Sequence, residues 1–315
     1  MQPVRGKVNV RRTSYGGQLR RDLTVNCELY LLFIPVLLFY ILFHYAPMYG
    51  AVIAFKNFKP AKGIWGSSWV GLKHFQAFFQ SHYFWPLLRN TLVLSFSTLI
   101  FTFPIPVILA LLINELRSPY YARCVQTITY MPHFVSLVVV CGMVREFTAS
   151  DGLVTVLLTK VGFKQQTMLN NPSLFVPIYV ISAIWQESGW GSIIYLAALM
   201  GVDRELYEAA EIDGAGRWKR TIFITIPSIL PTIVIMFIMR VGKLMSIGAE
   251  KVILLYNPGI YDTADIISSY VYRRGIAGSD WSFSSAVGLF NSAINFILVI
   301  SVNKLSNKLT GSGLW

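Results

Sequence analysis

Apolar residues recur along the chain in long blocks, and shorter polar or charged segments separate these blocks. A helix needs roughly 20 consecutive apolar residues to cross the hydrocarbon core of a bilayer. Six blocks reach about that length, so the pattern predicts an all-α membrane protein with six transmembrane helices. The predicted spans cover residues 30–55, 92–113, 125–144, 174–200, 222–247 and 283–302.

The composition agrees with this pattern and excludes an ordinary soluble domain. Hydrophobic residues make up 54% of the chain and charged residues only 13%, whereas soluble domains usually carry about 25% charged residues. The net charge of +12 is compatible with nucleic-acid binding, but the basic residues lie mostly at the ends of apolar blocks. Membrane orientation explains that placement, so we expect a lipid bilayer as partner and no nucleic acid.

The distribution of Lys and Arg predicts the orientation in the membrane. With the N-terminus inside, the inner segments hold 14 Lys and Arg residues and the outer segments hold 11, spread over longer loops. The bias is modest, but six of these residues cluster within the first 22, ahead of the first span. The first helix usually dominates orientation, so both termini are predicted to be cytoplasmic.

These spans divide the chain into four predicted parts. The stretch 69–88 has Leu72, Phe75, Phe78 and Phe79 at helical spacing, which is typical of an amphipathic segment in the membrane interface. The parts are a basic cytoplasmic tail (1–28), the first transmembrane helix with this external segment (29–85), a core (86–303) containing a charged loop (201–221), and a cytoplasmic C-terminal tail (304–315).

The charged loop carries an unusual pattern for a chain this apolar. Residues 205–213 fit a helix in which Leu206, Ala209, Ala210 and Asp213 share one face. Gly214 would end that helix, because glycine tolerates a positive φ. Pro227 and Pro231 then lie one turn apart in the next span and predict a bend. The spacing favours a docking helix about as strongly as a merely solvated loop.

A resemblance decides between these two interpretations. The stretch EAAEIDGAGRWKRTIFITIP resembles the EAA signature of binding-protein-dependent ABC importer permeases. The matching positions are Glu208, Ala209, Ala210, Gly214, Ile224 and Pro227. The one departure is Ile226, where the family usually has leucine. In that family the EAA helix seats in a groove of the ATPase, so the resemblance implies an ATPase-coupling role for Glu208, Ala209, Ala210, Asp213, Gly214 and Pro227.

The resemblance extends over about residues 22–315. The stretches NTLVLSFSTLIFTFPIPVILALLINE and AIWQESGWGSIIYLAAL are similar to the core of sugar permeases of the maltose-permease class. EKVILLYNPGIYDTADIISSYVYR and the closing SGLW resemble a subgroup that handles polysaccharide-derived oligosaccharides. The family implies a type I importer fold in a bacterial cell membrane. It also implies four partners: a second EAA-type permease, an ATP-binding subunit dimer, an extracytoplasmic solute-binding protein and an oligosaccharide.

The chain has no motif for chemistry of its own. No GxxxxGK[ST] sequence occurs, so a phosphate-cradling loop is missing and a partner is expected to use the ATP and Mg²⁺. Three cysteines and four histidines match no metal or redox spacing. We therefore expect a transport subunit that is no enzyme and binds no cofactor or metal.

Ionisable residues inside spans are the candidates for a substrate pathway. Glu187 lies in the middle of the fourth predicted span, and Arg240 and Lys243 lie late in the fifth. Three interpretations remain open: a structural ion pair of Glu187 with one of the cations, direct contact with substrate, or extension of Arg240 to the membrane interface. Residues 222–239 hold no charge and span about 27 Å as a helix, which would allow the third.

Aromatic side chains could provide stacking surfaces for sugar rings. The candidates are Tyr130, Trp185, Trp190 and Tyr195, although aromatics in membrane helices often only pack. A neutral oligosaccharide is the default cargo, and the two cations raise the alternative of a carboxylate-bearing sugar. The competing class is an ion-coupled secondary transporter of small polar solutes, but no internal repeat of the kind such proteins often have is visible. A membrane-embedded enzyme lacks any visible catalytic motif.

Overall fold

The computed structural model describes residues 23–311 and 313–314. These residues divide into two compact units, one ending at Val52 and the other beginning at Ile53. Most of the predicted basic tail, residues 1–28, lies outside the described residues. The described part of the first unit is a helix, α2 (Cys27–Tyr40), followed by a π-helical stretch η1 (Ile41–Tyr45), α3 (Ala46–Met48) and the start of η2 (Tyr49–Phe55).

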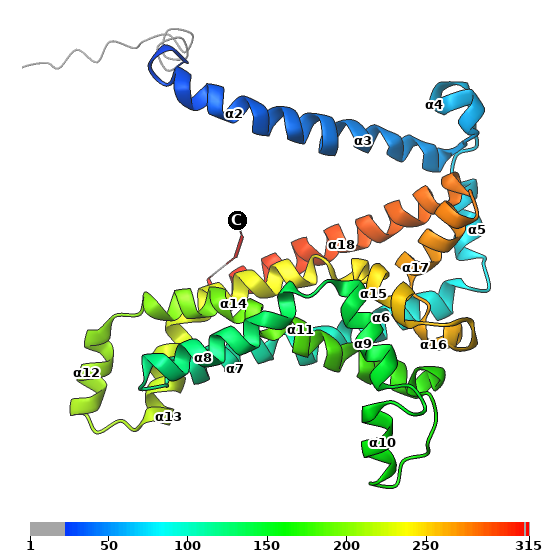
Figure 1. The fold of residues 1–315 in the computed structure, drawn as a ribbon. Coiled ribbons are helices and arrows are strands. Elements are labelled where there is room, and N and C mark those ends of the chain that lie inside the picture. The colour runs from blue at the N-terminus through cyan, green and yellow to red at the C-terminus, as the bar shows by residue number, and fades with distance from the viewer. Residues whose placement is uncertain (1–22, 312, 315) are drawn as a thin grey trace, which may run out of the picture. The chain divides into compact units, whose positions relative to one another are not determined.

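The second unit is built from long helices joined by short ones (Figure 1). A two-residue antiparallel pair, β1 (Lys56–Asn57) and β2 (Ser68–Trp69), joins Lys56 to Trp69 and Asn57 to Ser68. The long helices are α6 (Phe84–Thr102), α7 (Pro104–Asn114), α8 (Pro119–Tyr130), α9 (Leu137–Phe147), α11 (Pro172–Met200), α14 (Ile226–Val241) and α18 (Trp281–Thr310).

Short elements connect and cover the long helices. They are η3 (Pro60–Lys62), α4 (Gly63–Gly66), α5 (Lys73–Phe79), η4 (Met131–Phe134), α10 (Leu153–Thr159), η5 (Met168–Asn170), α12 (Arg204–Ile212), α13 (Arg217–Arg220), η6 (Thr221–Thr225), η7 (Leu244–Ser246), α15 (Ala249–Leu255), η8 (Pro258–Ile260), α16 (Tyr261–Ala264), α17 (Ile267–Val271) and η9 (Tyr272–Ala277).

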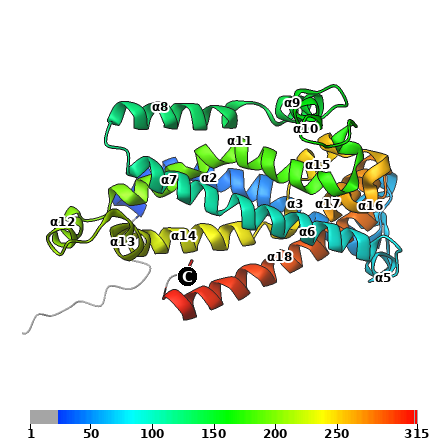
Figure 2. The ribbon, with the colours of Figure 1, turned by 90° about the horizontal axis from the view of Figure 1, so that it is seen from below.

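Helix α11 is the centre of the second unit. It contacts α6, α7, α8 and α14, and α14 in turn contacts α18; Figure 2 shows these long helices running alongside one another. Two glycines permit the closest approaches. A Cβ on Gly189 would lie 1.9 Å from the carbonyl oxygen of Thr129 in α8, and one on Gly191 would lie 3.1 Å from Pro106 in α7. Trp190 lies between these glycines, at the place where α11 comes nearest to α7 and α8.

Four helices of the described residues are long and apolar enough to cross a membrane: Cys27–Phe55, Phe84–Asn114, Arg217–Val241 and Trp281–Lys308. The predicted third span is not one straight helix. Helices α8 and α9 meet at 96°, because Pro132 ends the first and Ser136 caps the second by accepting a hydrogen bond from the Val139 N–H. Counted as one broken span, this pair would be a fifth.

The residues of the predicted fourth span form a single helix of 29 residues, α11. It is not among the four helices that are apolar enough to cross a membrane, because Gln186, Glu187 and Ser188 lie at its middle. The predicted fifth span is shorter than expected. Its helix ends at Val241, and the chain then turns through η7 where 222–247 predicted continued helix.

The predicted interfacial segment forms α5, but its aromatic face is divided. Phe78 is buried and packs edge-on against Phe84, Phe283 and Phe290. Phe79 and the preceding Leu72 are exposed. The segment is therefore anchored to α6 and α18 through Phe78, which a segment lying freely on a membrane surface would not be.

Candidate functional site

The predicted docking helix forms at the expected place as α12. The Asp203 side chain caps it by accepting a hydrogen bond of 3.0 Å from the Glu205 N–H. At its other end Gly214 has a φ of +76°. The Ala215 N–H donates to the Ala210 carbonyl (2.8 Å) and the Gly214 N–H to the Glu211 carbonyl (3.0 Å). This is the Schellman arrangement that satisfies the last carbonyls of a helix, and it confirms glycine as the stop.

Two polar contacts fasten α12 to the helix that follows. The Tyr207 hydroxyl and the Thr225 hydroxyl are 2.9 Å apart, and Arg220 pairs with Glu211 at 3.0 Å. Thr225 directly precedes α14, and Pro227 stands in the first turn of α14. A displacement of α12 would therefore be transmitted directly to the N-terminal end of α14.

The opposite face of α12 is open. Glu208, Ala209 and Asp213 are exposed, and Ile212 exposes 87% of its surface. Glu211 is engaged with Arg220 inside the loop, whereas Glu208 forms no ion pair with any of the described residues. Glu208 is thus available to an external cation, as is Glu205 in the first turn of the helix.

The three charged candidates of the spans lie together around two adjoining cavities. The first cavity, of about 300 Å³, extends between α6, α11 and the segment 243–251. The second, of about 250 Å³, extends between α7, α11 and α14. Four residues line both cavities and mark their junction: Thr102, Glu187, Arg240 and Lys243. The three charged residues that the sequence singled out thus line the same two cavities.

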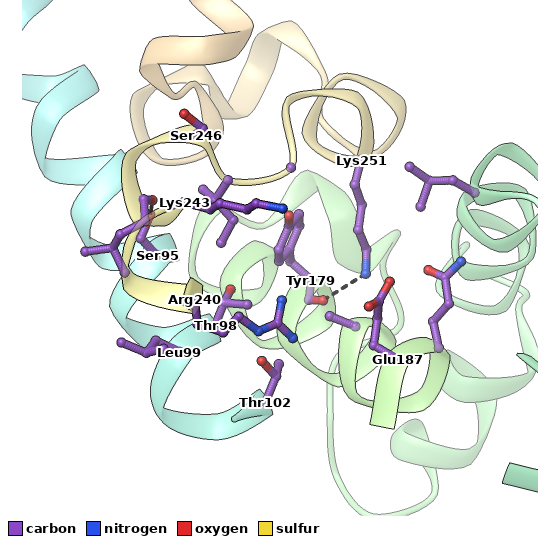
Figure 3. A pocket seen from close by; sticks show the side chains of 16 residues that line it. Ser95, Thr98, Leu99, Thr102, Tyr179, Glu187, Arg240, Lys243, Ser246 and Lys251 are labelled. Carbon is purple, nitrogen blue, oxygen red and sulfur yellow. Dashed lines mark hydrogen bonds between the residues drawn. The ribbon is translucent and has the colours of Figure 1, made fainter. Parts of the chain in front are cut away.

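A third cation belongs to the first cavity. Lys251, from α15, lines it together with Tyr179 of α11. Figure 3 shows the side-chain ends of Arg240, Lys243, Lys251 and Glu187 directed toward the same space. The cavity walls therefore carry three cations and one carboxylate. Sequence analysis missed Lys251 because it lies beyond the spans.

The turn that carries these cations is pinned from two sides. The Ser95 hydroxyl of α6 donates to the Leu244 carbonyl at 2.5 Å. From α18, Asn295 accepts from the Met245 N–H and Asn291 donates to the Met245 carbonyl, both at 2.9 Å. Gly248 then adopts a φ of +36° directly before α15. This turn brings Lys251 back toward the cavity that Lys243 lines.

No ion pair neutralises the junction. In residues 23–311 the pairs within 4.0 Å are Arg220–Glu211, Arg273–Asp265 and Arg274–Asp280. Glu187 is paired with neither Arg240 nor Lys243, so the structural ion pair considered from sequence is not formed. Both Glu187 and Arg240 are exposed at the junction.

The aromatic candidates divide between different places. Trp190 and Tyr195 line the second cavity. One face of Trp190 is stacked on His133, with ring centroids 4.6 Å apart and planes at 3°, and the indole remains 43% exposed. Trp185 lines a separate apolar cavity between α9 and α11, and Tyr130 lines none of these cavities. Trp190 is thus the aromatic surface beside the charges.

The described residues contain no group of three or more His, Cys, Asp or Glu side chains that could hold a metal ion. The walls of the two cavities offer charged, hydrogen-bonding and aromatic side chains. With three cations and one carboxylate, such walls can attract a polar, anionic solute.

Comparisons with known proteins agree on one family. Residues 88–311 match the family described as binding-protein-dependent transport system inner membrane component. Protein LplB of Bacillus subtilis (strain 168) is 45% identical over 288 residues, covering 91% of each chain. The polygalacturonan/rhamnogalacturonan transport system permease protein YteP of the same organism is 43% identical, covering 91% of this chain and 90% of its own.

A solved structure has the same fold. It is a chain of a bacterial alginate ABC transporter, crystallised in complex with an alginate pentasaccharide-bound periplasmic protein. The two chains are 40% identical and superpose with a TM-score of 0.86, covering 94% of this chain and 100% of the other. The chain therefore shares the overall fold of that transporter chain.

Proposed function

Because the chain belongs to the family of binding-protein-dependent transport system inner membrane components, we propose that it is the permease subunit of an ATP-driven oligosaccharide importer. It is a multi-pass membrane protein of the sugar ABC transporter permeases. In this proposal it forms half of a translocation pathway, and a second EAA-type permease forms the other half. A solute-binding protein delivers the cargo from outside, and a separate ATPase dimer uses ATP and Mg²⁺.

The proposal includes six spans with both termini in the cytoplasm. Helix α11 serves as the fourth span although its middle is polar, because the polar residues face the cavities rather than lipid. The bent pair α8–α9 serves as the third. The basic cluster in residues 1–22 supports this orientation.

Coupling to the ATPase is assigned to α12. Its exposed face, with Glu208, Ala209 and Asp213, would seat in the ATPase, and small residues allow a close approach. The contacts Tyr207–Thr225 and Arg220–Glu211 would carry the resulting movement to α14. Arg240, at the far end of α14, lies at the junction of the two cavities, so one helix connects ATPase closure to the pathway.

For the cargo we propose an oligosaccharide that bears carboxylates. The observation that carries this choice is the surplus of cations around the cavities: Arg240, Lys243 and Lys251 against Glu187. Charges attract strongly where water is scarce, and the free face of Trp190 would stack on a sugar ring. Relatives named for polygalacturonan/rhamnogalacturonan and for alginate support the same chemistry. The neutral sugar expected by default is thereby displaced.

The experiment is a binding-protein-stimulated ATPase assay on the reconstituted complex. A panel of uronate oligosaccharides and neutral oligosaccharides of matched length is added with the cognate binding protein. Stimulation by uronates supports the proposal. Stimulation confined to neutral sugars contradicts the cargo, and lack of stimulation by any sugar contradicts the importer itself. No observation favours the ion-coupled secondary transporter.

A further inference from the structure

Lys251 differs from the other charged residues of the first cavity by its burial. Arg240, Lys243 and Glu187 are exposed there, whereas Lys251 exposes only 6% of its surface. Its side chain nevertheless lines the cavity. The ammonium group thus sits at the inner wall of a space that the other three charges border at its edge.

The contacts of Lys251 fix its position but leave its charge without a counter-ion. The ammonium donates one hydrogen bond, of 3.2 Å, to the Tyr179 carbonyl, and it lies 4.8 Å from the centre of the Tyr179 ring. An ammonium has three N–H donors. None of the carboxylates in the described residues lies within 4.0 Å of it.

Elsewhere in the fold a carboxylate neutralises a cation that is less buried than Lys251, with 33% of its side chain exposed. Arg273 lies between the Tyr261 and Tyr270 rings and forms two hydrogen bonds with Asp265, which is buried. A buried cation kept only for structure is expected to have such a partner. Lys251 has the aromatic ring and the carbonyl but no carboxylate within 4.0 Å among the described residues; Glu187, in the same cavity, acts on it only from farther away. A carboxylate from a ligand would complete its contacts.

We propose that Lys251 is the specificity-determining residue of the pathway, and that its ammonium receives the carboxylate of the sugar unit in the first cavity. This inference rests on the proposed function. Arg240 and Lys243 attract the anionic chain at the junction, and Glu187 limits how tightly it is held. Lys251 distinguishes a uronate from its neutral counterpart.

Burial explains why Lys251, rather than the exposed cations, would discriminate. Exposed charges are screened by water and salt, so they contribute little to selection. At a buried polar group, a ligand that lacks the matching charge leaves that group unpaired, and such sites reject the wrong ligand strongly. A hydroxymethyl group in place of the carboxylate would leave the Lys251 ammonium in that state.

The test measures uptake by the complete complex in proteoliposomes with its binding protein. The probes are a uronate trisaccharide and the same trisaccharide with its carboxyls reduced to alcohols. Because one binding protein delivers both sugars to every variant, its own preference cancels when ratios are compared. Lys251→Gln is expected to reduce the uronate-to-neutral uptake ratio about tenfold or more, the usual effect of losing a hydrogen bond to a charged group. Lys251→Arg keeps the charge and is expected to keep most of the preference.

The matched control is Arg145→Gln. Arg145 lies in α9, lines neither cavity and donates to the Leu254 carbonyl in α15. The substitution Arg145→Gln removes one positive charge beside α15, and the uronate-to-neutral uptake ratio should stay within twofold of the wild type. A fall in the ratio equal to that of Lys251→Gln would mean that only the general positive potential matters, and the assignment to Lys251 would be abandoned.

A pH series provides a second measurement that a structural role would not move. Burial lowers the pKa of Lys251 from its usual value to about 8, and the neighbouring Cys141 and Glu187 offset only part of this. The ammonium is therefore charged at pH 7 and largely neutral at pH 9. The KM for the uronate should rise from pH 7 to pH 9 in the wild type and stay constant in Lys251→Arg. Both variants are measured with the same ATPase, so any pH effect on the ATPase is common to the two.

Several titratable and charged groups surround Lys251. Helix α17 contributes no charged side chain, and its Tyr270 accepts a hydrogen bond from Arg274. The others are Tyr179 and Glu187 from α11, Cys141 and Arg145 from α9, Arg240 from α14, Lys243 after it, and Glu250 from α15 itself.

The outcomes separate the inference from the proposed function. If the wild-type complex takes up neither sugar with ATP, the importer proposal is wrong, and the role proposed for Lys251 is rejected together with it. If the wild type works but Lys251→Gln lowers both uptakes equally, Lys251 is structural. The inference is also overturned if the KM for the uronate changes with pH in the same way in the wild type and in Lys251→Arg. This pH test does not depend on Lys251→Gln, so it can be made even if that variant fails to assemble.

Discussion

At the scale of single residues, equal charge does not mean equal role. For Arg273, burial opposes the charge, but the Asp265 carboxylate outweighs it, so the pKa of this arginine lies above its ordinary value. For Lys251 burial prevails and the pKa falls to about 8. The first cation is locked into the fold over the whole accessible pH range. The second has no carboxylate within 4.0 Å among the described residues, which fits a residue that meets a charged ligand.

Arg240 and Lys243, the two cations that line both cavities, can be substituted one at a time. We expect Arg240→Gln and Lys243→Gln each to reduce uronate uptake by about two- to fivefold and neutral uptake by less than twofold, because exposed charges contribute modestly. The measurement is initial uptake rate after complex assembly has been verified. Equal loss for both sugars, restored by also changing Glu187→Gln, would instead reveal an ion pair that supports the structure.

At the scale of elements, α12 is the segment that sequence analysis predicted most completely. Local chemistry determines it: an Asp cap, small residues on one face, and a glycine with positive φ. The bend between α8 and α9 was missed because apolar content alone predicted the span, and Pro132 and Ser136 were overlooked. The role of Lys251 could not be predicted, because it depends on a turn that distant residues of α6 and α18 hold in place.

The coupling helix provides a test at this scale. Glu208→Lys should repel the cationic groove proposed for the ATPase and lower its recovery in detergent pull-downs severalfold, while membrane insertion stays normal. Glu211→Gln is the matched control, because Glu211 is engaged with Arg220 inside the loop. Full ATPase recovery with Glu208→Lys would show that Glu208 does not take part in docking.

Gly214→Val tests the end of the same helix. A β-branched residue at a φ of +76° costs about 1–3 kcal/mol, although a Cβ there would meet no atom within 4 Å. The strain is thus purely conformational and local to the turn. Loop accessibility and ATPase recovery should both change, whereas the thermal stability of the spans should stay close to the wild type. A substitution without effect on coupling would remove the requirement for this turn.

At the scale of the whole molecule, the account depends on topology. The cation-bearing cavities and the docking helix must lie at different levels of the membrane, and α14 must join them. A reporter active only outside the cytoplasm should give no signal when fused near Gly216 and a strong signal when fused near Gly275. The reversed pattern would place α12 on the wrong side for an ATPase and would contradict the six-span proposal.

The central claim is that ATP hydrolysis by a partner drives an acidic oligosaccharide through this chain. The most direct measurement is accumulation of a radiolabelled uronate oligosaccharide in proteoliposomes that contain the complete complex, with ionophores present to collapse all ion gradients. The account predicts uphill accumulation that requires ATP and the binding protein and persists without any gradient. Accumulation that is independent of ATP and disappears when the gradients collapse would contradict it and would indicate an ion-coupled carrier.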